Sequence, residues 1–578
     1  MPVQPPSPAT DAPRSDSSWS RRSLLQLALA GAGALGTGQV LARAGVLGPD
    51  GSGAVTQKGV GGVIFEDSPV QGPVVPKFAR DLVVPPVLRP TSTRDGVDYY
   101  DLEHRVATAQ ILPPPFPATQ VFAYNGIVPG PTIRQTRNGN RTVVTNKNSL
   151  PAGHPYSMHL HGSPSQPAFD GHPDDLVAPG ASKVYKYPNS QESRTLWYHD
   201  HAVHQTADHV YKGLAGFFLQ DPSAADIAKF GLDRLPAGKY DVPLMIGDMQ
   251  FDTRGQVRFD DEGQDSLWGN VNVVNGIAFP RLRVDRTRYR FRMLVASVSR
   301  GYQFQLSNRM PMTIIATDAG LLPAPVQVNS FRHGMAERYD VVIDFSKLAV
   351  GTKVTLMNTA ADGDMRQVLQ FVVEGPVVAS SPVPARLNDV AFPDEADVVA
   401  TREFRFDRSN GLWTINGLPW DDTVAAAPRL GTTEKWVLQN NSGGWFHPVH
   451  IHLVDFQMLR RDDGPVLPYE QGWKDVAYVG PNERVEVLMT FHEPDRIDPA
   501  QPTTGMYVMH CHNLVHEDHD MMNQFETQPG DAAVAVPAGH EVGGHGAGGH
   551  GADGHAGSGA GQPGVVPPSM MVQWELRA

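Results

Sequence analysis

Short segments in which apolar and polar residues alternate, separated by turns rich in glycine, proline and asparagine, run from about residue 81 to residue 530. Alternation with a period of two is typical of half-buried β-strands, and long stretches with the 3.6-residue period of a helix are few. The chain has 578 residues, with Gly 57, Pro 50 and only 19% charged residues, which agrees with strands joined by turns. The pattern therefore predicts an all-β protein.

One pattern recurs three times in this region. Each copy opens with a turn and continues through a strand-like segment and an alternating segment; the turns are YNGI at 124–127, VNGI at 274–277 and INGL at 415–418. A spacing of about 140–150 residues is too long for a solenoid unit and suits a β-sandwich domain. We therefore expect three copies of one Greek-key β-sandwich, at residues 81–228, 229–385 and 386–530.

The N-terminal segment carries a targeting pattern. Arg21 and Arg22 precede a moderately apolar run that ends at Ala42-Arg43-Ala44, a small-x-small cleavage pattern. This predicts a twin-arginine export signal over residues 1–44 and a periplasmic or extracellular protein; the alternative is an uncleaved tail or an amphipathic helix. No other stretch reaches about 18 consecutive apolar residues, so we expect no stable membrane anchor once the signal is removed.

Two further segments lie outside the three copies. Residues 45–80 are rich in glycine, valine and proline, and we expect them to be loosely ordered. Residues 531–578 form a Gly/His-rich tail that we expect to be disordered, with histidines at 540, 545, 550 and 555. These histidines are compatible either with loosely bound metal or with a solvated tail.

The charge and cysteine content exclude some classes of function. A formal net charge of −13 argues against binding nucleic acid or an anionic membrane through bulk electrostatics. The single cysteine, Cys511, excludes an intrachain disulfide framework. Stability must therefore come from the apolar core, for which a chain of this length suffices.

Eight histidines form four H-x-H pairs in apolar or aromatic surroundings. Alternate residues of a strand share a face, so each pair directs two imidazoles to one place. Eight imidazoles in four such pairs would be poor core material and indicate a metal site. The pairs are His159 and His161, His199 and His201, His450 and His452, and His510 and His512.

Cys511 indicates a second site. It lies between His510 and His512, so its side chain points the opposite way from theirs. His447 precedes His450 by an odd number of residues and can serve the same second site, and a histidine and a methionine follow closely, His516 and Met521. Two histidines, one thiolate and a distant thioether describe a blue-copper electron-transfer centre, whereas zinc gains nothing from an axial methionine.

These motifs resemble those of the multicopper oxidases over about residues 85–530, and the match is best to bilirubin oxidases and bacterial laccase-like relatives. The segments that carry the resemblance are HLHGSPSQPAFDG, SRTLWYHDHAVH, VYKGLAGFFLQD, GWFHPVHIHLVDF and HCHNLVHEDHDMM. The resemblance implies three cupredoxin-like domains and four copper ions, with a trinuclear cluster between the first and third domains. The middle copy has one histidine, His333, and resembles a spacer.

The resemblance also implies a role for each ligand. A type 1 copper would take His447, Cys511 and His516, with Met521 axial. A type 2 copper would take His159 and His450. A type 3 pair would take the remaining six imidazoles, His161, His199, His201, His452, His510 and His512.

The implied reaction is one-electron oxidation of small aromatic donors (phenols, aromatic amines or bilirubin-like tetrapyrroles) coupled to four-electron reduction of O₂ to water. Trp445, beside His447, either lines the donor pocket or packs in the core. Asp170 and Glu517 are candidate proton relays, and the alternative is that they only orient imidazoles. We expect Asp200 to face away from the cluster. His204, His209 and His519 match no ligand position.

Two other functions remain open. One is a metal oxidase that acts on Cu⁺, although the 18 methionines are scattered and form no methionine-rich insertion. The other is a copper-storage or electron-carrier protein without oxidase activity, which would not need eight further paired histidines. We expect a monomer, while the physiological donor is not encoded in any motif.

Overall fold

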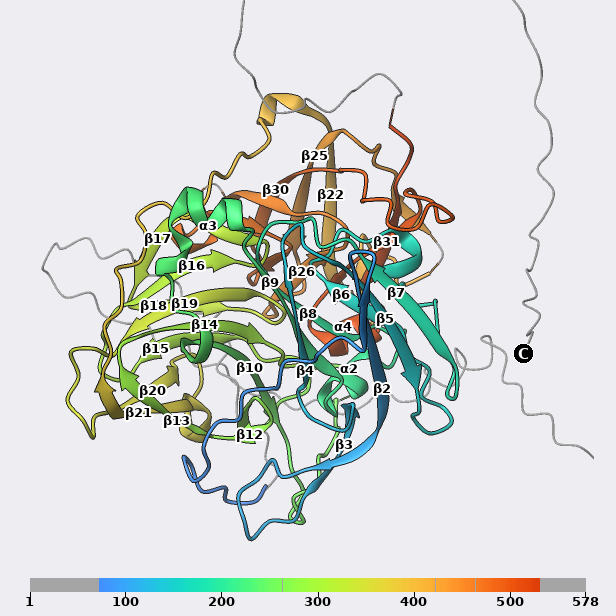
Figure 1. Cartoon of the computed structure of the whole chain (residues 1–578). Helices are drawn as coiled ribbons and strands as arrows, with labels where there is room; N and C mark the ends of the chain where they lie inside the picture. Colours follow the sequence, from blue (N-terminus) through green and yellow to red (C-terminus); the bar gives the residue numbers. More distant parts are fainter. Residues whose placement is uncertain (1–71, 262, 422, 463, 531–578) are drawn as a thin grey trace, which may run out of the picture. The chain divides into compact units, whose positions relative to one another are not determined.

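The computed structural model describes residues 72–530 except 262, 422 and 463, all within one compact unit of the chain, Lys58–Ala578. Strands dominate these residues, and Figure 1 shows them coloured along the sequence from blue to red. The strands form six sheets, two in each of the three sequence copies. The predicted all-β fold of three cupredoxin-like sandwiches is confirmed.

The first copy contains two sheets. One has the order β1-β2-β5-β7, with β3 paired to β2, and the other has the order β4-β9-β8-β6. Their bounds are β1 (Ser92–Arg94), β2 (Val97–Ala109), β3 (Thr119–Tyr124), β4 (Gly130–Thr136), β5 (Arg141–Asn148), β6 (Met158–His161), β7 (Ser182–Tyr187), β8 (Thr195–Asp200) and β9 (Ala215–Asp221).

The middle copy also contains two sheets, with the orders β12-β11-β10-β14-β19-β16-β17 and β13-β21-β20-β15-β18. Their bounds are β10 (Asp241–Met249), β11 (Val271–Val274), β12 (Ile277–Ala278), β13 (Arg281–Arg286), β14 (Arg288–Val295), β15 (Tyr302–Leu306), β16 (Met312–Thr317), β17 (Gly320–Val328), β18 (Ser330–His333), β19 (Arg338–Asp344), β20 (Lys353–Asn358) and β21 (Gln367–Val377).

The third copy repeats the plan, with the orders β23-β22-β25-β30-β27-β28 and β24-β32-β31-β26-β29. Their bounds are β22 (Val398–Ser409), β23 (Leu412–Ile415), β24 (Val424–Ala426), β25 (Thr433–Asn440), β26 (His447–Ile451), β27 (Phe456–Arg461), β28 (Trp473–Lys474), β29 (Val476–Val479), β30 (Arg484–Thr490), β31 (Met506–Cys511) and β32 (Met522–Glu526).

The three Asn-Gly turns of the sequence repeat have the same structure. Asn125, Asn275 and Asn416 have φ of 51°, 48° and 56°, a left-handed conformation that asparagine tolerates better than most residues. Each asparagine side chain accepts a hydrogen bond from a backbone N–H of a preceding strand, at 2.8, 2.8 and 2.7 Å respectively. In each copy, this hydrogen bond therefore holds the turn against a preceding strand of the same copy.

Each copy has its own apolar core, and a further cluster joins them. Trp197 and Phe217 of the first copy pack with Leu294 and Ala336 of the middle copy and with Val476 of the third. Burial of apolar surface is the main favourable contribution to folding. This shared cluster therefore holds the three copies together close to the strands that carry the H-x-H pairs.

Three short α-helices occur among the described residues: α2 (Thr206–Tyr211), α3 (Ala224–Phe230) and α4 (Leu514–Asp518). Helices α2 and α4 pack through Val210 and Leu514, among other apolar residues (Figure 1). The Asp518 carboxylate accepts hydrogen bonds from the backbone N–H groups of Thr206 and Ala207, at 3.0 and 2.7 Å. The segment after Cys511 is therefore held against the first copy.

The predicted export signal at 1–44, most of the segment 45–80 and the tail 531–578 lie outside the described residues. Residues 72–80 of the second segment are described, and they contact the middle copy. Val75 is buried, and the Phe78 N–H donates to the Phe279 carbonyl at 2.8 Å. Among the described residues, no helix is both long enough and apolar enough to cross a membrane.

Candidate metal centre

The four H-x-H pairs lie on or directly after four strands. In the first copy, β6 pairs antiparallel with β8, which places His159 opposite His199. In the third copy, β26 pairs antiparallel with β31, which places His450 opposite His510. The strand pair of the first copy therefore brings two H-x-H motifs together, and the strand pair of the third copy brings together the other two.

The imidazoles of the two outer copies meet. Their ring nitrogens form three groups in which the ligand atoms lie within 4.8 Å of one another: His159, His161 and His450; His161, His199 and His512; and His201, His452 and His510. Each group combines residues of the first and third copies. The structure thus brings all eight predicted imidazoles together between these copies, with none left aside.

These eight rings are buried and lack polar partners at several nitrogens. Among the described residues, no partner is found for His161 Nδ1, His199 Nε2, His201 Nδ1 or either ring nitrogen of His512. Burial, followed by the proximity of other imidazoles, lowers the pKa of His161 and of His201 well below the ordinary value. Neutral imidazoles with free lone pairs, directed at one another, fit bound metal ions.

Backbone carbonyls orient several of the rings. His159 Nδ1 lies 2.6 Å from the Asp170 carbonyl oxygen, and His450 Nδ1 lies 2.8 Å from the Asp475 carbonyl oxygen. His199 Nδ1 lies 2.8 Å from the Asp200 carbonyl oxygen. An N–H donated to a carbonyl fixes the tautomer of the ring and leaves the other nitrogen, Nε2, free to bind a metal.

Two buried carboxylates contact the group formed by His201, His452 and His510. Asp170 Oδ2 lies 2.7 Å from His452 Nδ1, whereas Asp170 Oδ1 makes no hydrogen bond to a described residue and lies 3.8 Å from His159 Nδ1. Burial raises the pKa of Asp170 well above its ordinary value. Glu517 Oε2 lies 2.8 Å from His510 Nδ1, and Glu517 Oε1 lies 3.7 Å from His201 Nε2. Both predicted relay residues are therefore placed beside the imidazoles.

A separate buried site forms around Cys511. Its Sγ lies 3.2 Å from His447 Nδ1 and 3.8 Å from His516 Nδ1, while the two histidine nitrogens are 3.3 Å apart. The Asn513 N–H points at Sγ from 3.4 Å. Met521 is fully buried in the same apolar cluster as Cys511. Cys511 thus joins different partners from its neighbours His510 and His512, as side-chain alternation requires.

The Cys511 thiol is in an unfavourable place for a free thiolate. Burial raises the pKa of Cys511 well above the ordinary thiol value, and the nearby Glu517 charge adds to this effect. A thiolate is the form that binds metal, and a bound cation stabilises it. A cysteine with two inward-facing imidazoles and a buried thioether nearby is a donor set suited to copper.

Aromatic side chains enclose the histidines of this site. The Trp413 ring stacks on His516, with ring centroids 3.6 Å apart and an interplanar angle of 25°, and the Trp413 indole N–H donates to the Gln264 carbonyl at 2.7 Å. Trp445 is partly buried, and its ring meets the His516 ring edge-on, with the ring centroids 5.4 Å apart. The predicted residue Trp445 therefore lies at the site, in contact with His516.

Ser442, which belongs to no sequence motif, contacts a candidate ligand. Its hydroxyl oxygen lies 2.7 Å from His447 Nε2, and the Asn440 side chain anchors it at 2.7 Å. The surrounding loop, residues 441–444, is exposed or half-buried. No local pattern identifies Ser442 or Trp413, because each reaches the site through the folding of the loop or strand that carries it.

The remaining histidines near the motifs have other partners. The buried carboxylate of Asp200 accepts from the Ser157 N–H at 2.9 Å and contacts His209, so Asp200 faces away from the imidazole groups. His204 Nδ1 lies 2.8 Å from the Asp518 carbonyl oxygen, and His519 Nε2 lies 2.9 Å from Asp261 Oδ2. None of the three histidines belongs to the groups described above.

Comparison with known proteins gives three matches to sequence models described as multicopper oxidase. They cover residues 105–224, 245–367 and 393–531. Each match lies within one of the three predicted sandwich copies, apart from a single residue at the last boundary.

Similar proteins include a bilirubin oxidase and a laccase. A bilirubin oxidase from Albifimbria verrucaria is 38% identical over 496 residues, covering 80% of this chain and 83% of that protein. A laccase from Bacillus subtilis is 32% identical over 525 residues, and the match covers 78% of this chain and 98% of that protein. The crystal structure of a laccase from Pediococcus acidilactici matches with a TM-score of 0.71 and 27% sequence identity. The match covers 78% of this chain and 95% of that chain.

Proposed function

We propose a function for this chain, which belongs to the multicopper oxidase family and is an oxidoreductase. The proposed reaction couples one-electron oxidation of small aromatic donors to four-electron reduction of O₂ to water. The donors are phenols, aromatic amines or bilirubin-like tetrapyrroles. The similarity to a bilirubin oxidase and to laccases supports this donor class.

The proposed cofactor is a set of four copper ions, one held apart from a cluster of three. The type 1 ligands are His447, Cys511, His516 and Met521; the type 2 ligands are His159 and His450; the type 3 ligands are His161, His199, His201, His452, His510 and His512. When bound, the ions supply reversible one-electron redox chemistry, and the cluster supplies multi-electron O₂ reduction.

One observation carries the proposal: three consecutive residues divide between two sites. Cys511 lies with His447 and His516, while His510 and His512 lie with the imidazoles of the first copy. The backbone from Cys511 to either neighbour gives a short covalent path for electrons. An electron carrier would need only the first site, so the second site favours an oxidase over a carrier.

The donor is proposed to dock beside the 441–445 loop. Trp445 offers an aromatic face, and Ser442 touches the Nε2 edge of His447, so an electron leaving a donor here crosses only the serine hydroxyl and one imidazole. At His516 the corresponding Nε2 edge is closed by the Asp265 carbonyl at 3.0 Å and by Trp413. Oxidation at the His447 edge is therefore favoured.

Asp170 and Glu517 are proposed to deliver the four protons that O₂ reduction consumes. Each carboxylate contacts an imidazole of the cluster, at 2.7 and 2.8 Å respectively, and a carboxyl group can pass a proton that an amide cannot. Asp170 Oδ1 makes no hydrogen bond to a described residue, which leaves it available to a water molecule.

Oxygen uptake by the copper-loaded mature protein tests this function. Addition of a phenol should start O₂ consumption without accumulation of peroxide, and Cys511→Ser should abolish donor-driven uptake. A parallel arm with Cu⁺ as donor separates a metal oxidase from an oxidase of aromatic compounds. A fully copper-loaded protein that takes up no O₂ with either donor would instead be a storage or carrier protein.

The cellular site is proposed from the N-terminal residues alone. A twin-arginine signal over residues 1–44 would export the folded, metal-loaded protein to the periplasm or beyond. Replacement of Arg21 and Arg22 by lysines should retain the protein in the cytoplasm, as fractionation with an antibody would show. We also propose that the exported protein is a monomer, which sedimentation can test.

A further inference from the structure

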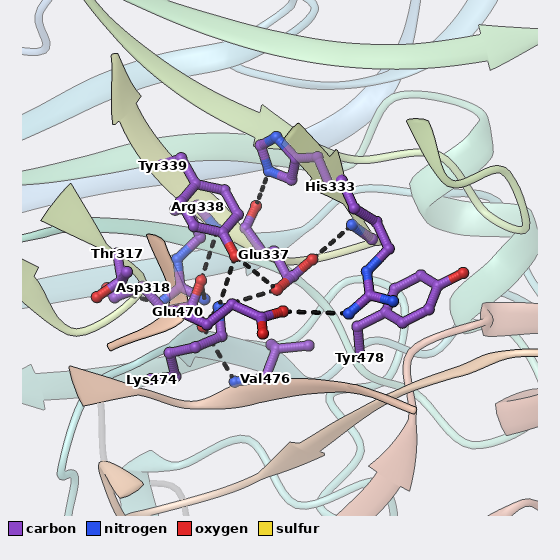
Figure 2. Close-up of polar contacts among 12 residues, drawn as sticks. Thr317, Asp318, His333, Glu337, Arg338, Tyr339, Glu470, Lys474, Val476 and Tyr478 are labelled. Carbon is purple, nitrogen blue, oxygen red and sulfur yellow. Dashed lines mark hydrogen bonds and ion pairs between the residues drawn. The ribbon is translucent and has the colours of Figure 1, made fainter. Parts of the chain in front are cut away.

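A network of buried charges lies where the middle copy meets the third copy (Figure 2). Lys474 Nζ lies 2.9 Å from both Asp318 Oδ2 and Glu337 Oε1. Arg338 pairs with Asp475, and every side chain of the five is at most 1% exposed. The set contains three carboxylates and two cations, so with all five ionised it leaves one negative charge unbalanced.

The Arg338 guanidinium has a complete set of hydrogen bonds. Its five N–H groups reach the Thr195, Ala336 and Asp318 carbonyls, at 2.9, 3.0 and 3.1 Å, and both oxygens of Asp475, at 2.6 and 2.5 Å. Thr195 opens strand β8 of the first copy, and Asp475 lies in the third. A planar fork with five fixed donors thus ties all three copies at one point.

Asp475 contacts two candidate ligands, one from each outer copy. Its carboxylate Oδ1, which Arg338 already binds, lies 3.1 Å from His161 Nε2. Its carbonyl oxygen lies 2.8 Å from His450 Nδ1. The Asp475 carboxylate therefore contacts one ring and its backbone carbonyl contacts the other, and both rings belong to the same imidazole group as His159.

We propose that Arg338, from the copy without any candidate ligand, is a positioning residue of the metal centre, acting through Asp475 on His161 and His450. This inference rests on the proposed copper cluster and adds a role for the middle copy, which would be more than a spacer. The bidentate pair holds Asp475 in one orientation, and the unbalanced negative charge of the network partly offsets the positive charge of the cluster.

The close packing at Gly162 supports this role. Gly162 follows His161 and has φ of +89°, and a Cβ at this position would lie 2.8 Å from both Arg338 Nη2 and Asp475 Oδ2. The ion pair is therefore seated directly against the end of the first ligand strand, without space for a methyl group. A small displacement of the pair would be transmitted to His161.

Two single variants test the inference in the copper-loaded full chain. Arg338→Lys keeps the positive charge and loses the fork, and Asp475→Asn keeps the shape and loses the bidentate pairing. Arg292→Lys is the matched control. Arg292 is 1% exposed in the middle copy, pairs with Asp241 at 2.8 Å and with Asp221 of the first copy at 3.3 Å, and contacts no candidate ligand.

The readouts are copper content, thermal unfolding, and the type 1 and type 2 signals in electron paramagnetic resonance. Removal of a partner that orients a metal ligand costs about 10–100-fold in metal affinity or activity. Both test variants should keep the type 1 signal and lose or shift the type 2 signal, with O₂ reduction slowed about 10–100-fold. The control should keep both signals even if its unfolding temperature falls.

If a single variant does not fold, a double variant, Arg338→Gln with Asp475→Asn, removes both charges of the ion pair together, so that neither partner is left as a buried charge without its counterion. A wild-type type 2 signal and wild-type O₂ reduction in any folded variant would overturn the positioning role. Absence of type 2 and type 3 copper from the loaded wild-type protein would instead contradict the proposed function itself.

Discussion

Replacement of Trp413 tests whether its ring positions His516 at the Cys511 site, in addition to stabilising the third copy. The Trp413 side chain is fully buried, stacks on His516 at 3.6 Å and donates its indole N–H to the Gln264 carbonyl. Trp413→Phe keeps an aromatic ring over His516 but loses the N–H. Trp413→Ala removes the ring altogether.

The expected losses of stability differ between the two variants. Truncation of a buried tryptophan to alanine costs about 3–5 kcal/mol. The phenylalanine variant loses one hydrogen bond, about 0.5–1.5 kcal/mol, and part of the buried ring, for a total near 2 kcal/mol. At about 2–4 °C per kcal/mol, the unfolding transition of the third copy should fall by about 10 °C for Trp413→Ala and about 5 °C for Trp413→Phe.

The two Trp413 variants should also differ in their blue absorption. Without the stacked ring, one face of His516 loses its support and only the polar contacts at Nε2 orient the imidazole, so Trp413→Ala should weaken the blue type 1 absorption of the loaded protein, whereas Trp413→Phe should retain it. Trp436→Ala is the control, because Trp436 is equally buried in the same copy and packs on Phe404, Phe491 and Phe525.

Calorimetry and absorption spectroscopy on the three variants check this reasoning. Trp436→Ala should lose as much stability as Trp413→Ala and keep its colour. If both alanine variants lose the blue absorption equally, general loosening of the core explains the effect. If Trp413→Ala keeps full colour and donor oxidation, the stacking contact does not position His516.

The remaining predictions address the relay, the axial ligand, a buried histidine and the metal. Asp170→Asn should slow O₂ reduction about 10²–10⁴-fold in a reoxidation assay and leave the type 1 absorption intact, and wild-type turnover would reject the relay role. Met521→Leu should raise the type 1 potential in a redox titration, because the weak axial ligand is removed; an unchanged potential would mean that Met521 is not axial. Burial lowers the pKa of His333 from 6.5 to about 4, so its contribution to stability is complete above pH 6.5 and is lost as pH falls toward 4. His333→Gln should therefore remove about 3 kcal/mol of the acid sensitivity in urea titrations across this range, relative to wild type. Removal of copper by a chelator should lower the unfolding temperature, and added copper should restore it in a concentration-dependent way. An unchanged unfolding temperature would mean that copper does not bind preferentially to the folded state.

Local patterns predicted the fold and the division of the site. Alternation identified the strands, and the three Asn-Gly turns marked the repeat because asparagine and glycine are needed where φ is positive. Strand parity separated Cys511 from His510 and His512, because a period of two leaves no other arrangement. These features depend on residues that are close in sequence.

The missing parts depend on residues that are far apart in sequence. Trp413, on strand β23, reaches His516 on helix α4, and its sequence context does not differ from that of any core tryptophan. Arg338 reaches Asp475 across 137 positions, and neither residue belongs to a histidine motif. Such pairings follow from how the copies pack together, which the pattern of a single chain does not specify.

Anomalous X-ray scattering at the copper edge, from crystals of the loaded protein, would locate every metal ion. We predict one ion bound by Cys511, His447 and His516, and three further ions among the eight paired imidazoles, with His510 and His512 on the cluster side. A single ion that binds Cys511 together with His510 or His512, or no ions among the imidazoles, would contradict this prediction.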